Sequence, residues 1–339
     1  MSPEILVFAD GSRPIGYGHL TRMRSLCDLT GLPYHVVTRT PEHTKNIFDE
    51  PGTDIRAIDS MEEIVDVARS TDASLVILDP PYAQDWADES TGPFWQSTID
   101  KIRQAGKKVA RFTDEAAPTQ HRCDLLVNDH PNSTEFGEDY KKMGFDGGLL
   151  SGPSYFLIDP QHRALNVNDR QRDDQLFVSF GGSDQLGVVD RLLPGLQKIS
   201  DRLSIHLIIG AGHPGAIPQS AGLKISKGLP PPEFALGLRE SRMVLTGAGN
   251  TLFERAYHGT PGLCVSQSTH QETIGIAFER LGTTGYIGRG DQISLDFLVQ
   301  SVIALWDDDD ARRLQRQSCA ALDIQCGCDA IVDAVRGLT

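Results

Sequence analysis

A glycine-rich segment near the start of the chain carries two side chains that can take part in acid–base chemistry. Asp10 opens the segment and His19 closes it, with Gly16 and Gly18 shortly before the histidine. Glycine lets a backbone approach a ligand closely, and an imidazole changes its charge near neutral pH. The segment therefore has the composition of an active-site loop. The alternative is a tight turn with a surface histidine, in which the aspartate only caps the turn.

A second segment places two glycines before two polar residues. Gly181 and Gly182 are followed by Ser183 and Asp184. Backbone N–H groups at the start of a helix can bind the oxygens of a pyrophosphate, and the helix dipole favours the anion. Serine and aspartate also cap helices, so a capped turn without a ligand fits this segment equally well.

A third segment combines small residues with a carboxylate. Gly249, Asn250 and Thr251 stand at the expected start of a helix, and Glu254 follows about one turn later. A carboxylate there can accept hydrogen bonds from the hydroxyl groups of a ribose. A solvated glutamate on a helix surface is the alternative for any single carboxylate of this kind.

The elements that must hold these segments form a regular pattern. Apolar, strand-like runs alternate with longer amphipathic segments such as 20–29. The runs lie at 5–8, 34–37, 75–78, 109–112 and 125–127, and then at 176–180, 205–209, 243–246 and 262–265. Nearly continuous apolar strands of this kind predict parallel sheets with helices on both faces. Ligands of such sheets lie beyond the carboxyl ends of the strands, where the glycine-rich segments stand.

The length of 339 residues predicts two domains, because one ordinary core does not reach that size. The segment 159–175 is polar and lacks apolar periodicity, which is typical of an interdomain linker. We expect an N-terminal domain at 1–160 and a C-terminal, nucleotide-binding domain at 161–339. The last helix is a candidate to pack back on the N-terminal domain.

The composition excludes several classes of protein. A net charge of -14 argues against a nucleic-acid partner, which needs a basic face. No apolar run is long enough to cross a bilayer, and the first residues lack a signal-peptide pattern, so a cytoplasmic protein is expected. The six cysteines are scattered and predict reduced thiols, mostly in cores. The acidic run 307–310 predicts a solvated loop or a helix start.

The spacing of the functional residues also follows the motifs of a known family. The pattern D-x-x-x-x-I-G-x-G-H-x-x-R is present as Asp10, Ile15, Gly16, Gly18, His19 and Arg22. The pattern S-x-G-G-S-D is present as Ser179, Gly181, Gly182, Ser183 and Asp184. The pattern A-G-x-T-x-x-E is present as Ala248, Gly249, Thr251 and Glu254, followed by Gly259, Pro261 and the pair His270 and Gln271. Asp79 with Tyr82, and the segments 113–115, 123–126 and 152–155, keep the same order.

In these motifs the chain resembles the UDP-2,4-diacetamido-2,4,6-trideoxy-β-L-altropyranose hydrolases of pseudaminic acid biosynthesis and the related spore-coat polysaccharide proteins. The resemblance implies an α/β protein of the GT-B type, in which two doubly wound, Rossmann-like domains face a central cleft. Two departures concern the substrate. Phe8 stands where the family has arginine, and Pro80 and Pro81 replace the histidine expected before Tyr82.

The family's reaction implies that water attacks the anomeric carbon of a nucleotide-activated amino or deoxy sugar and releases UDP with inversion, without a metal or another cofactor. His19 would be the general base and Asp10 its orienting partner. Contacts with the substrate or its nucleotide are expected at Gly16, Gly18, Arg22, Tyr82, Gly181, Gly182, Ser183, Asp184, Gly249, Asn250, Thr251, Glu254, His270 and Gln271. The sequence leaves the sugar and the oligomeric state open.

Two other functions fit the same residues. An inverting GT-B glycosyltransferase would use the same donor site with a hydroxyl acceptor in place of water. A non-catalytic nucleotide-sugar binding protein is the second alternative, and the loss of arginine at Phe8 is its main support.

Overall fold

The computed structural model describes residues 5–12, 16–80, 92–165, 173–182, 184, 186–210, 212–213 and 222–339, with only the backbone for 92–94. The chain forms two compact units. The first unit contains residues 1–160 and 324–339, and the second contains residues 161–323. The division after Pro160 coincides with the expected boundary, while the end of the chain belongs to the first unit.

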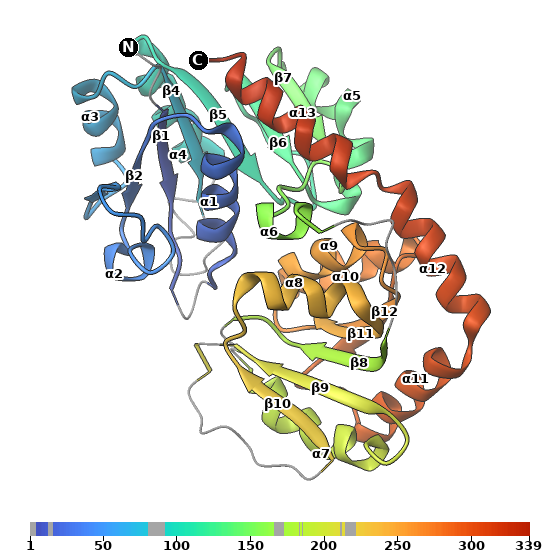
Figure 1. Ribbon diagram of the computed structural model, residues 1–339. Helices are drawn as coiled ribbons and strands as arrows, with labels where there is room; N and C mark the ends of the chain where they lie inside the picture. The colour runs from blue at the N-terminus through green and yellow to red at the C-terminus, as the bar shows by residue number, and fades with distance from the viewer. Residues whose placement is uncertain are drawn as a thin grey trace. The chain divides into compact units, whose positions relative to one another are not determined.

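The first unit is built on a parallel sheet of seven strands in the order β3-β2-β1-β4-β5-β6-β7 (Figure 1). The strands are β1 (Ile5–Ala9), β2 (Tyr34–Thr38), β3 (Asp54–Ala57), β4 (Leu75–Asp79), β5 (Lys108–Thr113), β6 (Leu125–Asn128) and β7 (Gly148–Ser151). All five apolar runs expected in this half are strands. The two additional strands, β3 and β7, lie at the edges of the sheet. Their side chains are half-buried or exposed, so they lack the apolar run that marks a central strand.

Helices cover both faces of this sheet. They are α1 (Gly18–Thr30), α2 (Pro41–Thr44), α3 (Glu63–Ser70), α4 (Gly92–Gln104), α5 (Gly137–Lys142) and α13 (Ile324–Arg336), with a 3-10 helix, η2, at Pro131–Glu135. Side chains of a strand alternate between faces. Ile5 and Val7 of β1 accordingly pack with α1 and α13, whereas Leu6 and Phe8 pack with α3 and α4.

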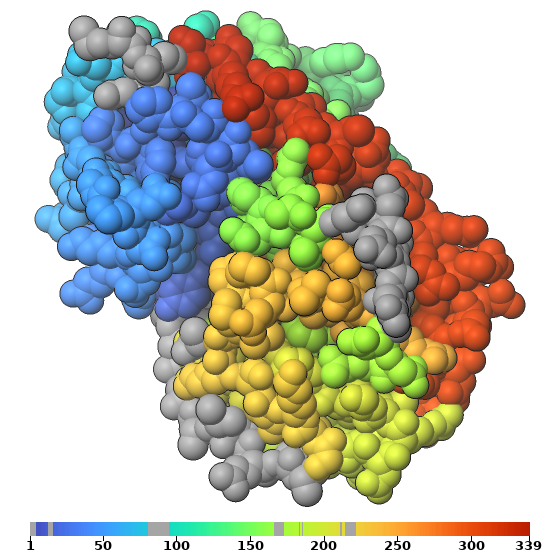
Figure 2. All heavy atoms as spheres, in the orientation of Figure 1, coloured from blue at the N-terminus to red at the C-terminus, as the bar shows by residue number. Residues whose placement is uncertain are grey.

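The last helix, α13, completes the core of the first unit. Cys328, Ile331 and Val335 are fully buried among the apolar side chains of β1 and α1. Arg336 donates hydrogen bonds to the carbonyl oxygens of Leu29 and Thr30 at the end of α1. Figure 2 shows α13, in red, at the surface beside the blue N-terminal elements. The chain thus returns to its first unit after it has passed through the second.

The second unit has a parallel sheet of six strands in the order β10-β9-β8-β11-β12-β13. The strands are β8 (Asp173–Ser179), β9 (Ser204–Ile209), β10 (Leu223–Lys227), β11 (Ser241–Gly247), β12 (Gly262–Ser266) and β13 (Gly285–Arg289). The helices are α6 (Pro160–Arg163), α7 (Val188–Ile199), α8 (Pro231–Glu240), α9 (Asn250–Tyr257), α10 (Thr269–Arg280), α11 (Leu295–Asp307) and α12 (Asp309–Ala321). The edge strands β10 and β13 again have no apolar run and were not expected.

Several smaller expectations also have outcomes in the structure. The expected linker 159–175 contains the short helix α6 and the start of β8. All six cysteines are free thiols, and only Cys326 is exposed. Asp308, in the acidic run, caps α12 by accepting a hydrogen bond from the N–H of Ala311. Within the described residues, no helix combines the length and the apolar character that crossing a bilayer requires.

Candidate functional site

The carboxyl edge of the first sheet gathers aspartates from four neighbouring strands. Asp79 is the last residue of β4, and Asp10, Asp114 and Asp129 follow directly after β1, β5 and β6. The chain order reverses between β1 and β4, because β1 is flanked by β2 on one side and β4 on the other. A reversal of this kind is where parallel α/β sheets bind ligands. The four aspartates therefore lie at or beside the expected binding position.

His19 and Arg22, both on α1, meet at the carboxylate of Asp79. Nδ1 of His19 lies 2.9 Å from Oδ1 of Asp79. The guanidinium of Arg22 donates to both oxygens of the same carboxylate, at 3.0 Å and 2.6 Å. Its remaining nitrogen donates to Oδ2 of Asp129 at 2.7 Å. Arg22 thus fixes two buried carboxylates beside the histidine, and one of these carboxylates holds the imidazole.

The Asp79 carboxylate determines which nitrogen of His19 carries the proton. An ionised carboxylate only accepts hydrogen bonds, so the facing Nδ1 is the N–H nitrogen. Nε2 then keeps its lone pair, and among the described residues it has no hydrogen-bond partner. The His19 side chain is 15% exposed, whereas Asp79 is fully buried. This arrangement presents a lone pair toward the accessible side of the imidazole.

Asp10 has a different role from the one expected. Its Oδ1 accepts hydrogen bonds from the hydroxyl of Thr38 at 2.8 Å and from the backbone N–H of Arg39 at 2.6 Å. Nε of Arg39 lies 3.3 Å from Oδ2. Asp10 is fully buried and ties the end of β1 to the end of β2. The partner that orients His19 is Asp79, which corrects the assignment made from sequence.

The buried charges shift one another's proton affinities. Burial opposes the charge on Asp79, but Arg22 and His19 outweigh it and hold the pKa of Asp79 below its usual value. Burial likewise opposes the charge on Arg22, and the carboxylates of Asp79 and Asp129 raise its pKa above the usual range. Burial raises the pKa of Asp129 to about 6, with Asp114 adding to the shift and Arg22 opposing it. Asp79 is therefore ionised at neutral pH, and Asp129 loses its proton at about pH 6.

The glycines of the first segment shape the loop between β1 and α1. Gly16 has a φ of +89°, which favours glycine strongly. The N–H of Gly16 donates to the carbonyl oxygen of Ser12 at 2.7 Å, and the N–H of Ser12 donates back at 3.2 Å. Gly18 is the first residue of α1. These contacts bring the amino end of α1, with His19 as its second residue, to the carboxyl edge of the sheet.

The second unit has its own reversal of chain order, at β8. This strand is flanked by β9 and β11, and the two remaining glycine-rich segments follow β8 and β11. Gly181 has a φ of +89°, and the carbonyl oxygen of Gly182 accepts a hydrogen bond from the N–H of Gly212 at 2.9 Å. Both segments therefore occupy the binding position of the second sheet.

Asp184 supports the loop from inside. It is 3% exposed, and its two oxygens accept hydrogen bonds from the N–H groups of Val188 at 2.7 Å and Val189 at 3.1 Å. Asp184 thus caps α7, which was the alternative weighed for this segment, and its oxygens are engaged within the protein. Its expected contact with the nucleotide stays a prediction beside this structural role.

The third segment opens α9. Gly249 precedes the first turn, Asn250 and Thr251 begin it, and Glu254 lies one turn further along. The Glu254 side chain is 18% exposed, and its Oε1 lies 3.9 Å from Nε2 of the buried His162 on α6. The N-terminal N–H groups of α9 and the Glu254 carboxylate are thus presented at the end of β11.

Two glutamines connect the loops of the second unit, and only one of them was expected. Gln271 accepts a hydrogen bond from the N–H of Gln267 at 3.0 Å, and its amide nitrogen lies beside Gly249. Gln267, which is 7% exposed, donates from its side chain to the carbonyl oxygen of Phe180. His270 is half-buried at the start of α10. Gln267 joins the β8 and β12 ends, and no motif marked it.

Asp79 and Asp129 were the other residues that sequence reasoning left without a role. Each ends or directly follows a buried strand, and Asp79 also stands in the order of motifs that the resemblance rests on. Tyr82 and Ser183, both expected at the site, lie outside the described residues. Among the described residues, no group of three or more histidine, cysteine, aspartate or glutamate side chains is placed to hold a metal ion.

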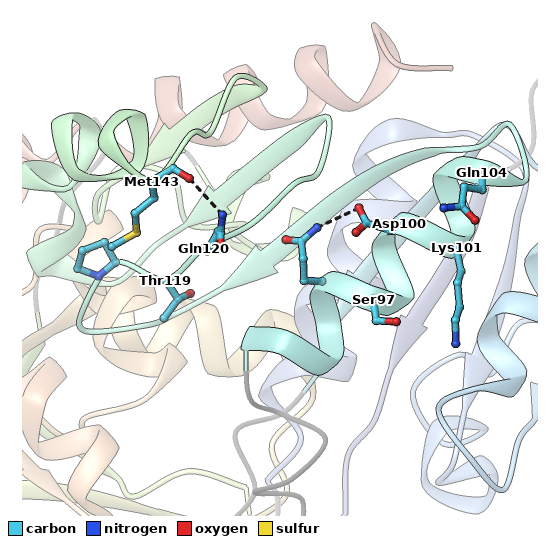
Figure 3. A pocket seen from close by; sticks show the side chains of 9 residues that line it. Ser97, Asp100, Lys101, Gln104, Thr119, Gln120 and Met143 are labelled. Atoms are coloured by element: carbon cyan, nitrogen blue, oxygen red, sulfur yellow. Dashed lines mark hydrogen bonds between the residues drawn. The ribbon is translucent and has the colours of Figure 1, made fainter.

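A surface cavity of about 1040 Å³ lies elsewhere in the first unit. Side chains of α4, including Ser97, Asp100 and Lys101, line one side, and Thr119, Gln120 and Met143 lie on the other (Figure 3). His19, Arg22, Asp79 and Asp129 do not line this cavity. The cavity lacks convergent charged groups, so we do not assign it to the chemistry of His19.

Comparison with solved structures identifies the fold. A putative UDP-N-acetylglucosamine 2-epimerase from Listeria monocytogenes superimposes with a TM-score of 0.63 at 14% identity, covering 99% of this chain and 96% of that one. MurG of Acinetobacter baumannii gives a TM-score of 0.64 at 14% identity, covering 99% of both chains. The calicheamicin glycosyltransferase CalG4 gives 0.63 at 16% identity, covering 100% of this chain and 98% of the other. The protein therefore has the GT-B fold, with two parallel-sheet, Rossmann-like domains.

Sequence relatives are distant. The spore coat polysaccharide biosynthesis protein SpsG of Bacillus subtilis is 19% identical over 310 residues, which cover 86% of each chain. The uncharacterized protein MJ1062 of Methanocaldococcus jannaschii is 21% identical over 292 residues, covering 79% of this chain and 56% of that protein. No model of a known protein family matches the chain.

Proposed function

We propose that this protein is a nucleotide-sugar hydrolase of polysaccharide biosynthesis, which releases UDP from an activated amino or deoxy sugar by inverting attack of water at the anomeric carbon. The observation that carries the proposal is the hydrogen bond between His19 and Asp79. The similarity to SpsG, whose name places it in spore coat polysaccharide biosynthesis, supports the biological setting. The GT-B fold is compatible with it.

His19 acts as the general base. Its Nε2 lone pair takes a proton from water as the water oxygen forms a bond to the anomeric carbon, and the bond from that carbon to the diphosphate oxygen breaks. The bonding electrons leave on the diphosphate. The proton that reaches Nε2 makes an imidazolium, which the ionised Asp79 stabilises through Nδ1. Arg22 keeps Asp79 ionised and in place.

The second unit receives the nucleotide. The backbone of Gly181 and Gly182 and the N-terminal N–H groups of α9, from Gly249 to Thr251, offer donors to the leaving diphosphate. Glu254 accepts hydrogen bonds from the ribose hydroxyls. Fixed donors at the position where negative charge develops stabilise the transition state more than the ground state.

The deciding experiment incubates the protein with a panel of UDP-sugars in oxygen-18 water, with and without sugar acceptors, and follows UDP release, the anomeric configuration and the label. We expect acceptor-independent UDP release with inversion and the label on the sugar. Label on UDP would indicate attack at phosphorus and refute the mechanism. Dependence of UDP release on an acceptor would identify an inverting glycosyltransferase, and UDP-sugar binding without turnover would identify a binding protein.

Activity in this scheme depends on side chains and backbone groups of the protein and needs no metal ion. Turnover is therefore expected to persist when EDTA is present at millimolar concentration. Loss of activity in EDTA, restored by a divalent cation, would show that the leaving diphosphate requires a metal in place of the backbone donors.

A further inference from the structure

Two buried histidines, His162 and His258, lie near Glu254 in the second unit. Nδ1 of His162, on α6, lies 2.9 Å from Nε2 of His258, which follows α9. Nε2 of the same His162 lies 3.9 Å from Oε1 of Glu254. His258 directly follows α9, and its N–H donates to the carbonyl oxygen of Glu254 at 3.2 Å. Both residues therefore lie on one side of the end of the helix, with the His162 imidazole between their side chains.

The three groups are sheltered from solvent to different degrees. His258 is fully buried, the His162 side chain is 5% exposed, and the Glu254 side chain is 18% exposed. Burial lowers the pKa of His162 to about 4, so the imidazole is neutral at pH 7. Each neutral imidazole has one N–H and one lone pair, and the short Nδ1 to Nε2 distance requires exactly one proton between the two rings.

The carboxylate selects between the two ways of placing that proton. If Nδ1 of His162 carried it, the lone pair of Nε2 would face the negative Glu254. If Nε2 of His258 carries the proton, Nδ1 of His162 accepts the hydrogen bond. Nε2 of His162 is then the N–H nitrogen and faces Glu254. The second arrangement places opposite partial charges together in a buried site and is the stable one.

We propose that His162 is a positioning residue for ribose recognition: its Nε2–H, held in that tautomer by His258, lies 3.9 Å from the Glu254 carboxylate and favours one orientation of that carboxylate electrostatically. The inference rests on the proposed role of Glu254 in binding the ribose. An oriented carboxylate loses less rotamer freedom when the ribose binds, so the gain is specific to the ribose hydroxyls and absent for the diphosphate.

The test compares three ligands by calorimetry: UDP, 2′,3′-dideoxy-UDP and inorganic pyrophosphate. His162→Phe keeps a ring of similar size and removes both nitrogens. We expect it to reduce the preference for UDP over the dideoxy analogue about fivefold to tenfold, and to leave pyrophosphate affinity within twofold. His162→Gln, whose amide nitrogen can replace Nε2, is expected to recover at least half of the lost preference.

Glu254→Ala separates this inference from the proposed function. If Glu254→Ala abolishes the preference for UDP while both His162 variants keep it in full, the positioning role is refuted and the ribose role stands. If wild-type protein does not distinguish UDP from the dideoxy analogue, the ribose role and the inference that depends on it both fail. His162→Gln decides the matter should His162→Phe fail to fold, as judged from its thermal transition.

Discussion

The pair of His19, at the start of α1, and Asp79, at the end of β4, is the smallest unit to which the chemistry can be assigned. Asp79 is buried and held by Arg22, so its position depends little on solvent or on ligand. A second pair, His35 with Asp54, has a similar distance of 2.8 Å but lies near the amino end of β2, away from the carboxyl edge. A short distance alone therefore does not define a catalytic pair. The position of the histidine and the aspartate at the carboxyl edge of the sheet defines it.

Replacement of His19 tests that assignment. His19→Asn is expected to lower turnover by about two orders of magnitude or more, the usual contribution of a general base, while UDP affinity stays within twofold. Adding Asp79→Asn to this variant should cost little more, because both residues act through one imidazole. Steady-state kinetics and calorimetry measure these effects, and His35→Asn is the matched control with normal turnover. Fully additive losses would assign Asp79 a role independent of His19.

Asp129 links the same cluster to stability. Its folded-state pKa of about 6 lies above the value of about 3.9 for an unfolded chain, so the folded protein holds the proton between these limits. This contribution to the free energy of unfolding is complete below about pH 4 and is lost as the pH rises through about 6. Asp129→Asn should remove this part of the pH dependence in urea titrations. Asp72→Asn, at an exposed position, should keep this pH dependence. An unchanged pH dependence of the free energy of unfolding in Asp129→Asn would contradict the raised pKa of Asp129.

At the scale of elements, each sheet presents its glycine-rich loops at the strand where the chain order reverses. In the second unit the loop at Gly181 and Gly182 is also held by contacts with the backbone of the segment after β9. Gly210, directly after β9, lies against the carbonyl groups of Gly181 and Gly182. The shape of the proposed diphosphate loop therefore depends on a neighbouring strand end.

Gly210→Ala tests this dependence. A Cβ atom at Gly210 would lie 2.3 Å from the carbonyl oxygen of Gly182 and 2.4 Å from that of Gly181, so the loop must move. We expect a loss of about 1–3 kcal/mol in the free energy of unfolding, as for other overpacked sites, and at least tenfold weaker binding of UDP and of pyrophosphate. Gly137→Ala, with open space around its Cβ, is the control. Normal pyrophosphate affinity in Gly210→Ala would separate this loop from the diphosphate site.

At the scale of the whole molecule, the first unit is discontinuous in sequence. It is complete only when α13 contributes Ile331 and Val335 to the core beside α1. The second unit lies between these two parts of the chain. The element that carries His19 is thus supported by a helix that follows the second unit in the sequence.

Truncation of one α13 side chain tests that support. Ile331 is fully buried, so Ile331→Ala should lower the free energy of unfolding of the first unit by about 2–5 kcal/mol. Hydrogen exchange should report the loss in β1 and α1 and leave β8 and β11 unchanged. Leu314→Ala on α12, where the side chain is 55% exposed, is the matched control. A loss spread equally over both units would mean that they unfold together.

The sequence by itself determined the central strands of both sheets and the glycine-rich loops. Buried parallel strands need continuous apolar runs, and tight loops need glycine, so both leave local signals. The edge strands β3, β7, β10 and β13 leave none, because apart from the buried Ile287 of β13 their side chains are half-buried or exposed.

Only the tertiary structure decided which carboxylate serves His19. Asp10, close in sequence, binds Thr38 and Arg39, whereas Asp79 is 60 residues from His19 and Asp129 is 107 residues from Arg22. Parallel strands bring their carboxyl ends to one edge whatever the length of chain between them. Neighbours at that edge are set by strand order, which no local pattern encodes, and only the tertiary structure shows which side chains of the first unit α13 packs against.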